Sequence, residues 1–139
     1  MIDIDDPAFV CGNLGRIFVV RWRDDVTSAA MRRVFERLVE TRRELGIPLI
    51  SVSVIPNGIH GPKFESTQTT DEHFRIVDHL CDAVYAVVDS DSVLLPIFRG
   101  MMAVLALTLK AELQTCTSAE EAFAKMMENR IRFRAVLTP

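Results

Sequence analysis

Side chains that could bind a ligand or perform chemistry follow two apolar runs of this sequence. His60 and Lys63 come after the first run, and Asp89 and Asp91 come directly after the second. If both runs are parallel strands, these four side chains leave the same edge of a sheet, where α/β proteins bind ligands. The two aspartates could also hold Mg²⁺, but Asp and Ser are preferred helix caps, and we favour that interpretation.

A cluster of hydroxyl side chains precedes an expected second helix. Ser66, Thr69 and Thr70 are candidate phosphoacceptors, because a helix N-terminus favours a phosphate through its dipole and its free N–H groups. Thr69 and Glu72 also have the spacing of a capping box, which satisfies such N–H groups without a phosphate. We favour the capping interpretation here as well.

No catalytic motif is present in the chain. The phosphate-binding patterns GxGxxG and GxxxxGK[ST], the nucleophile motif GxSxG and the zinc motif HExxH are all missing. His73 and His79 are six residues apart, so on one helix they point about 120° apart and cannot share a metal ion. We therefore expect no catalytic residue, no metal site and no cofactor, with an enzymatic function as the weaker alternative.

The composition is that of one folded domain without a basic surface. Apolar residues make up 49 % of the 139 residues and charged residues 25 %, which excludes a disordered chain and suits a single domain over residues 1–139. The net charge of −3 lacks the excess of basic residues typical of nucleic-acid-binding domains, so we expect no nucleic acid partner. Three widely spaced cysteines among apolar neighbours indicate reduced thiols and a cytoplasmic protein.

No segment has the length expected of a membrane span. The longest apolar stretch, 93–109, is interrupted by Pro96, Arg99 and Gly100, whereas a spanning helix needs roughly 20 apolar residues. The acidic N-terminus lacks the basic region of a secretory signal. We expect the apolar stretch to form a helix buried in the core.

Hydrophobic periodicity predicts strands that alternate with helices after an opening hairpin. The predicted order is β-β-α-β-α-β-α-β-α, an α/β fold with helices packed on a mixed sheet whose central strands are parallel. The predicted strands are 8–11, 16–22, 48–55, 83–88 and 113–116, and the predicted helices are 28–45, one from about 70, one from the 89–92 cap to about 111, and one from 118.

The helical spacing also predicts which side chains face the core. We expect Cys81 on the inner face of the second helix, and Phe123, Met126 and Met127 on the inner face of the last. Trp22 ends a strand between two arginines, and strand alternation turns it to the opposite face, toward the core or a dimer contact.

The order and lengths of these elements resemble the STAS domain of anti-sigma-factor antagonists, and more closely the SpoIIAA-like proteins. The same broad fold resembles the lipid-binding SEC14-type domains, which are larger. The segments that carry the resemblance cover most of the chain: the hairpin 9–22, the helix 28–45, the strand 49–55, the helix from about 70, the strand 83–88, and the strand–helix unit 113–127 with its Ser-Ala-Glu-Glu-Ala-Phe sequence.

The resemblance implies a regulatory switch, and this sequence departs from it at the switch residue. In the antagonists a kinase phosphorylates a serine of an Asp-Ser turn that follows the third strand. Pro56, Asn57 and Gly58 occupy that position here, and the Asp89-Ser90 pair follows the next strand instead. No phosphoacceptor is therefore carried over from the family.

Together these features predict a non-enzymatic cytosolic regulatory or protein-interaction module that forms a homodimer. We expect its binding partners to contact the loop 56–70 and the exposed end of the second helix. One alternative is a small-molecule site or an enzyme site at the sheet edge between loops 56–70 and 89–92. Another is binding of an apolar or lipid ligand near Met101 and Met102, because flexible Met side chains adapt to ligands.

Overall fold

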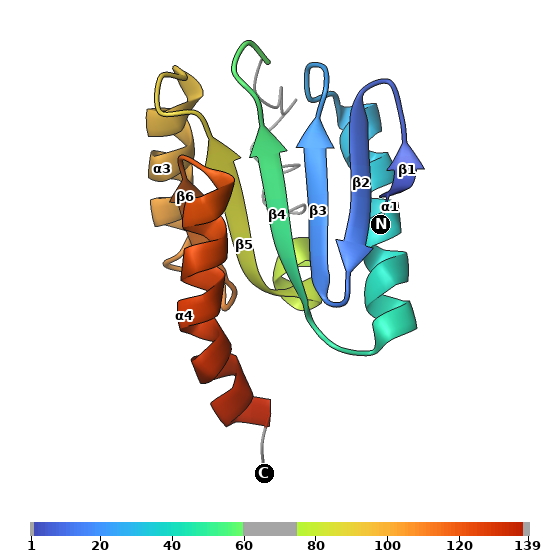
Figure 1. Ribbon diagram of the computed structural model, residues 1–139, viewed down its shortest axis with the longest axis vertical. Coiled ribbons are helices and arrows are strands. Elements are labelled where there is room, and N and C mark those ends of the chain that lie inside the picture. Colours follow the sequence, from blue (N-terminus) through green and yellow to red (C-terminus); the bar gives the residue numbers. More distant parts are fainter. Residues whose placement is uncertain (1, 60–74, 138–139) are drawn as a thin grey trace.

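The protein folds around a six-stranded mixed sheet in which the strands lie in sequence order (Figure 1). The computed structural model describes the backbone of residues 2–59 and 75–137. The first three strands are antiparallel, and the strands from the third to the sixth are parallel. The strands are β1 (Ile2–Asp5), β2 (Phe9–Leu14), β3 (Ile17–Trp22), β4 (Leu49–Ile55), β5 (Cys81–Val88) and β6 (Glu112–Cys116). The predicted α/β class and mixed sheet are thus confirmed.

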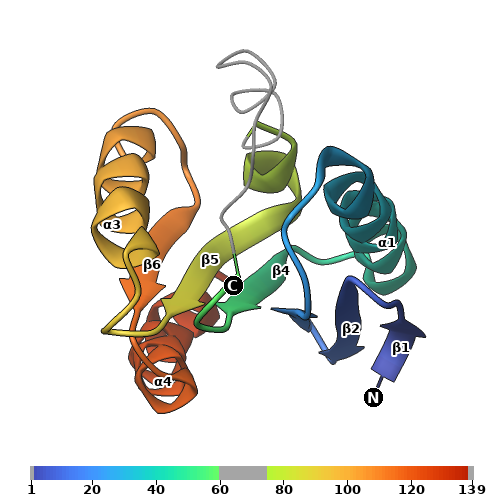
Figure 2. The same cartoon turned by 90° about the horizontal axis from the view of Figure 1, so that it is seen from above.

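Helices cover the two faces of this sheet unequally. Helix α1 (Ser28–Leu45), a helical segment at 75–80 and helix α3 (Leu94–Leu105) lie on one face, which we call the α1–α3 face. Helix α4 (Ala119–Leu137) lies on the other, the α4 face, over β5 and β6 (Figure 2). Among the described residues, no helix is long and apolar enough to cross a bilayer.

Strand alternation divides the core into two clusters. In β3, Phe18, Val20 and Trp22 point to the α1–α3 face, and Ile17 and Val19 point to the α4 face. Strand β5 is buried on both faces, as its nearly continuous apolar sequence predicts.

Several predicted boundaries are corrected by the structure. The strand β1 was not predicted, because four residues rich in aspartate carry little strand signal. Cys81 is not a helical residue but begins β5, where it pairs with Leu49. Helix α3 ends at Leu105 rather than near residue 111, and the last helix continues to Leu137.

The inner face of α4 also differs from the expectation. Ala122 and Met126 are buried as a narrow stripe four residues apart, whereas Phe123 and Met127 remain 50 % and 60 % exposed. Of the described side chains of α4, one small residue and one methionine therefore form the contact with the core.

Local hydrogen bonds fix the ends of two helices. The hydroxyl of Thr27 accepts from the backbone N–H of Ala30 at 3.1 Å and caps α1, which ends at Gly46 in the left-handed region with φ of 70°. The hydroxyl of Ser118 caps α4 by accepting from the N–H of Glu121 at 3.1 Å. The Glu121 carboxylate accepts from the backbone N–H and the hydroxyl of Thr117, one residue before the position that a capping box predicts.

Replacing two glycines by alanine should change stability in opposite directions. Gly46→Ala forces a Cβ into the left-handed region and should lower the free energy of unfolding by about 1 kcal/mol. Gly100→Ala, inside α3 with no atom within 4 Å of the added Cβ, should raise it by about 0.5–1 kcal/mol. Urea denaturation followed by circular dichroism measures both, and equal effects of the two substitutions would contradict the assigned backbone conformations.

The Glu121 contacts should give a pH-dependent contribution to stability. The hydrogen bonds from Thr117 hold the pKa of the Glu121 carboxyl below its ordinary value of 4.5. Because the folded chain favours the charged form, Glu121→Gln should be less stable than the wild type at pH 7, and the gap should close as pH falls below about 4.5. Glu120→Gln removes a charge from the same helical turn without removing these bonds. A Glu121→Gln gap that persists at pH 3 would refute the assignment.

Candidate functional site

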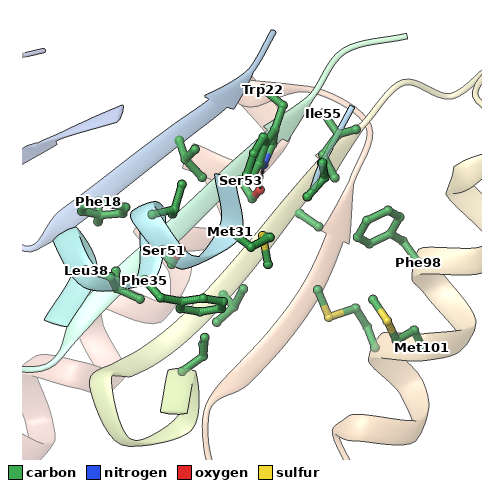
Figure 3. A pocket seen from close by; sticks show the side chains of 17 residues that line it. Phe18, Trp22, Met31, Phe35, Leu38, Ser51, Ser53, Ile55, Phe98 and Met101 are labelled. Atoms are coloured by element: carbon green, nitrogen blue, oxygen red, sulfur yellow. Dashed lines mark hydrogen bonds between the residues drawn. The ribbon is translucent and has the colours of Figure 1, made fainter. Parts of the chain in front are cut away.

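An apolar cavity lies between α1 and α3, over the middle of the sheet (Figure 3). Its volume is about 110 Å³. Strands β3, β4 and β5 form its floor, and α1, α3 and the helical segment 75–80 form its walls. It is therefore enclosed by elements from both halves of the chain.

The floor is hollow because the side chains of the central strand are short. Ser51 and Ser53 point from β4 into the cavity, and Ala86 lies beside Ser53 on β5. Their larger neighbours on β3, Phe18 and Val20, pair with the two serines in register. The small residues thus leave a depression between larger side chains.

The walls are built from adaptable apolar side chains. Met31 and Phe35 face the cavity from α1, and Phe98 and Met101 face it from α3 (Figure 3). The helical segment contributes Val77. Thioether and aromatic side chains can adjust to the shape of an occupant without exposing polar groups.

A hydrogen bond fixes Trp22 at one end of the cavity. Its indole N–H donates to the hydroxyl of Ser53 at 3.2 Å, and its side chain is only 2 % exposed. The ring of Phe9 packs on Trp22 with centroids 5.6 Å apart, and the Arg33 guanidinium lies 5.6 Å from the centroid of Phe9. Trp22 is therefore held from both sides, and the expectation that it faces the core is met.

The position of the helical segment is set by one further bond. Asp78 accepts from the backbone N–H of Ala111 at 2.7 Å, which ties residues 75–80 to the chain that enters β6. Val77 lies next to Asp78 and is buried against the cavity. This bond fixes one wall of the cavity relative to the sheet edge.

The described lining of this cavity is almost entirely apolar. Its described lining holds no carboxylate, amine, imidazole or thiol, and its polar groups are two serine hydroxyls and one indole N–H. Within the described ranges, no three His, Cys, Asp or Glu side chains come together as a metal site. The arrangement can exclude water and offer a hydroxyl to an apolar molecule.

The residues predicted from sequence lie elsewhere or outside the described chain. Asp89 and Asp91 are exposed in the turn after β5, where an Asp89 carboxylate oxygen accepts from the N–H of Asp91 at 3.0 Å. The Ser92 hydroxyl accepts from the N–H of Leu94 at the start of α3. Neither aspartate lines the cavity. Five candidates lie outside the described residues and stay predictions: His60, Lys63, Ser66, Thr69 and Thr70.

The sequence carried a partial signal for the true cavity. Met101 and Met102, singled out above for an apolar ligand, both line it. Ser51 and Ser53 occupy alternate positions in an otherwise apolar strand, so both lie on the face that lines the cavity. The sequence alone predicts this run only as a buried strand.

No protein-family model, curated protein or solved structure matches this chain. The functional argument below therefore rests on the geometry of the cavity and on the order of the elements.

The three cysteines are buried and do not form a reactive site. Cys11, Cys81 and Cys116 form no disulfide and have almost no exposed surface. Burial, followed by the charge of Asp82, raises the pKa of Cys81 to about 12. Burial likewise raises the pKa of Cys116. Both thiols stay protonated at neutral pH and are poor nucleophiles.

Thiol titration should reflect this burial. At pH 8 the native protein should react only slowly with a disulfide reagent, because the Cys81 thiol is protonated and shielded. In guanidinium chloride all three cysteines should react within the mixing time. A fast-reacting thiol in the native protein would contradict the burial described here.

Proposed function

We propose that this protein is a non-enzymatic binding module that holds a compact apolar ligand between α1 and α3. The observation that carries the proposal is the apolar cavity with two convergent serine hydroxyls. A well-formed apolar pocket with a few polar groups is the usual form of a small-molecule site. This develops the small-molecule alternative and moves its site from the sheet edge to the space beneath the helices.

The size and lining of the cavity restrict the ligand. Cavities of about 150 Å³ lined by aliphatic and aromatic groups hold a single benzene ring. A volume of about 110 Å³ is smaller than that and suits a short alkyl chain. Because burying an unpaired charge costs several kcal/mol, the ligand should be neutral, and one hydroxyl could pair with Ser51 or Ser53.

Binding is favoured over catalysis at this site. Acid–base and nucleophilic catalysis both need a titratable or activated group within hydrogen-bond reach of the substrate. Among the described lining residues, the groups that could pair with a substrate are Ser51, Ser53 and Trp22, and none has a base beside it on the cavity wall. A hydroxyl without a base is a poor nucleophile.

We further propose that the module is regulatory, of the STAS or SpoIIAA-like kind, and works in the cytoplasm as a homodimer or with a protein partner. The alternation of strands and helices after the opening hairpin supports the family, and the buried free thiols support a reducing compartment. The remaining proposed contacts for a ligand or partner are His60, Lys63, Asp89 and Asp91, and the proposed phosphoacceptors are Ser66, Thr69 and Thr70.

The single tryptophan makes ligand binding directly measurable. Trp22 lines the cavity, so its fluorescence should change in a saturable way when 1-propanol, a short neutral chain with one hydroxyl, is titrated into the protein. A ligand of this size should bind with a Kd of about 10 mM. Propionate, which has a chain of the same length but carries a charge, should bind at least tenfold more weakly.

Two variants separate the cavity from non-specific association. Ser51→Leu fills the floor of the cavity and should abolish the fluorescence change. If that variant does not fold, Ala86→Val fills the floor with a smaller increase in side-chain volume and should also abolish the change. Val54→Leu enlarges a half-buried side chain on the opposite face of β4 and should bind like the wild type. Equal binding by the filled variants, or no saturable change in the wild type, would overturn the proposed function.

A further inference from the structure

The α4 face carries an apolar area that no described element covers. Helix α4 lies over β5 and β6, and the part of the sheet toward β2 and β3 is open beneath it (Figure 2). Val10, Ile17, Val19 and Val54 point to this face by strand alternation and are only partly buried. We call these four residues the open shelf.

The sequence of β3, which carries part of the open shelf, is typical of a strand that is buried on both faces. A sheet with one face in water alternates apolar and polar residues, so that the wet face is polar. In β3, however, Ile17, Phe18, Val19 and Val20 form a continuous apolar run. Such a run is typical of strands buried on both faces.

The flank of α4 is also apolar. Phe123 and Met127 lie four residues apart on one side of the helix, next to the buried stripe of Ala122 and Met126. The α4 face therefore combines a raised helix with an exposed apolar flank and a flat apolar shelf on one surface.

We infer that a second copy of this chain covers the open shelf, with the α4 of each copy seated on the β2–β3 region of the other. A two-fold axis parallel to the strands, in front of the α4 face, places the helix of one copy over the shelf of its partner. Such an interface is isologous, because each copy supplies the same helix and the same shelf. The inference specifies the homodimer proposed above and does not depend on the cavity ligand.

The charges on this face suit that arrangement. Arg21 is exposed near the carboxyl end of β3 and points to the α4 face, and Glu120 is exposed in the first turn of α4. Because β3 and β6 run in the same direction, both residues lie at the same edge of the sheet. An axis parallel to the strands keeps that edge aligned in both copies, so Arg21 can meet Glu120 of the partner subunit.

The area available is just above the minimum for a specific dimer. A 19-residue helix is about 28 Å long and about 10 Å wide, and the dimer has two such helix-on-shelf contacts. At full overlap they bury about 560 Å² per partner, or about 1,100 Å² in total, which exceeds the roughly 1,000 Å² expected of a biological interface and lies below the roughly 1,600 Å² of a standard one.

Sedimentation velocity of the full chain tests this interface. The wild type should sediment as a dimer at about 50 µM. Arg21→Glu and Glu120→Arg should each weaken the dimer at least tenfold through like-charge contact, and the double variant should restore it. Val19→Asp should give a folded monomer, because a charge would be buried at the centre of the contact.

Ile97→Glu is the control, since Ile97 is an exposed apolar residue on α3, on the opposite side of the sheet. It should leave the dimer intact. A dimer that Ile97→Glu dissociates would overturn this interface but not dimerisation, whereas a wild type that is monomeric at 50 µM would overturn both. Binding of 1-propanol by Val19→Asp should persist, which separates this inference from the ligand proposal.

Discussion

The size of the side chains on one face of β4 is the constraint on which the site depends. A helix packs at about 10 Å from a sheet, and α1 and α3 stand apart on either side of the central strands. Among the described residues, the floor, the helix flanks and Val77 of the segment 75–80 are the groups that border the space between them. Ser51 and Ser53 are too short to fill it from below, so the flexible side chains of Met31, Phe35 and Met101 line a hollow instead of closing it.

Such a hollow is costly to the fold. At about 24 cal/mol per Å³, an empty cavity of 110 Å³ costs about 2–3 kcal/mol, against a net stability of about 5–15 kcal/mol for an ordinary domain. A larger residue at either serine would remove that cost, and Val or Ile would suit the strand better. The serines are therefore more easily explained by an occupant that fills the cavity, with the Trp22–Ser53 hydrogen bond keeping the floor in place.

Sequence reasoning predicted the elements better than the site. Hydrophobic periodicity was enough to predict the strands β3, β4 and β5 and the long helix α1, because each of these segments has a strong hydrophobic pattern and clear end signals. It failed for β1, whose aspartates mask the strand, and for Phe123 and Met127, because the width of the face that α4 buries depends on how close the helix lies to the sheet. The cavity depends on the distance between two helices that are far apart in the chain, which no local pattern contains. The methionines of α3 and the alternating serines of β4 were the local signals for it.

Diffraction from crystals of the protein under xenon pressure tests the central claim most directly, since xenon occupies dry apolar cavities and avoids polar ones. The account predicts a xenon atom between Trp22, Ser53 and Phe98, displaced in crystals of Ser51→Leu. Ordered water in that space, or Phe98 collapsed onto the floor with no xenon bound, would contradict it.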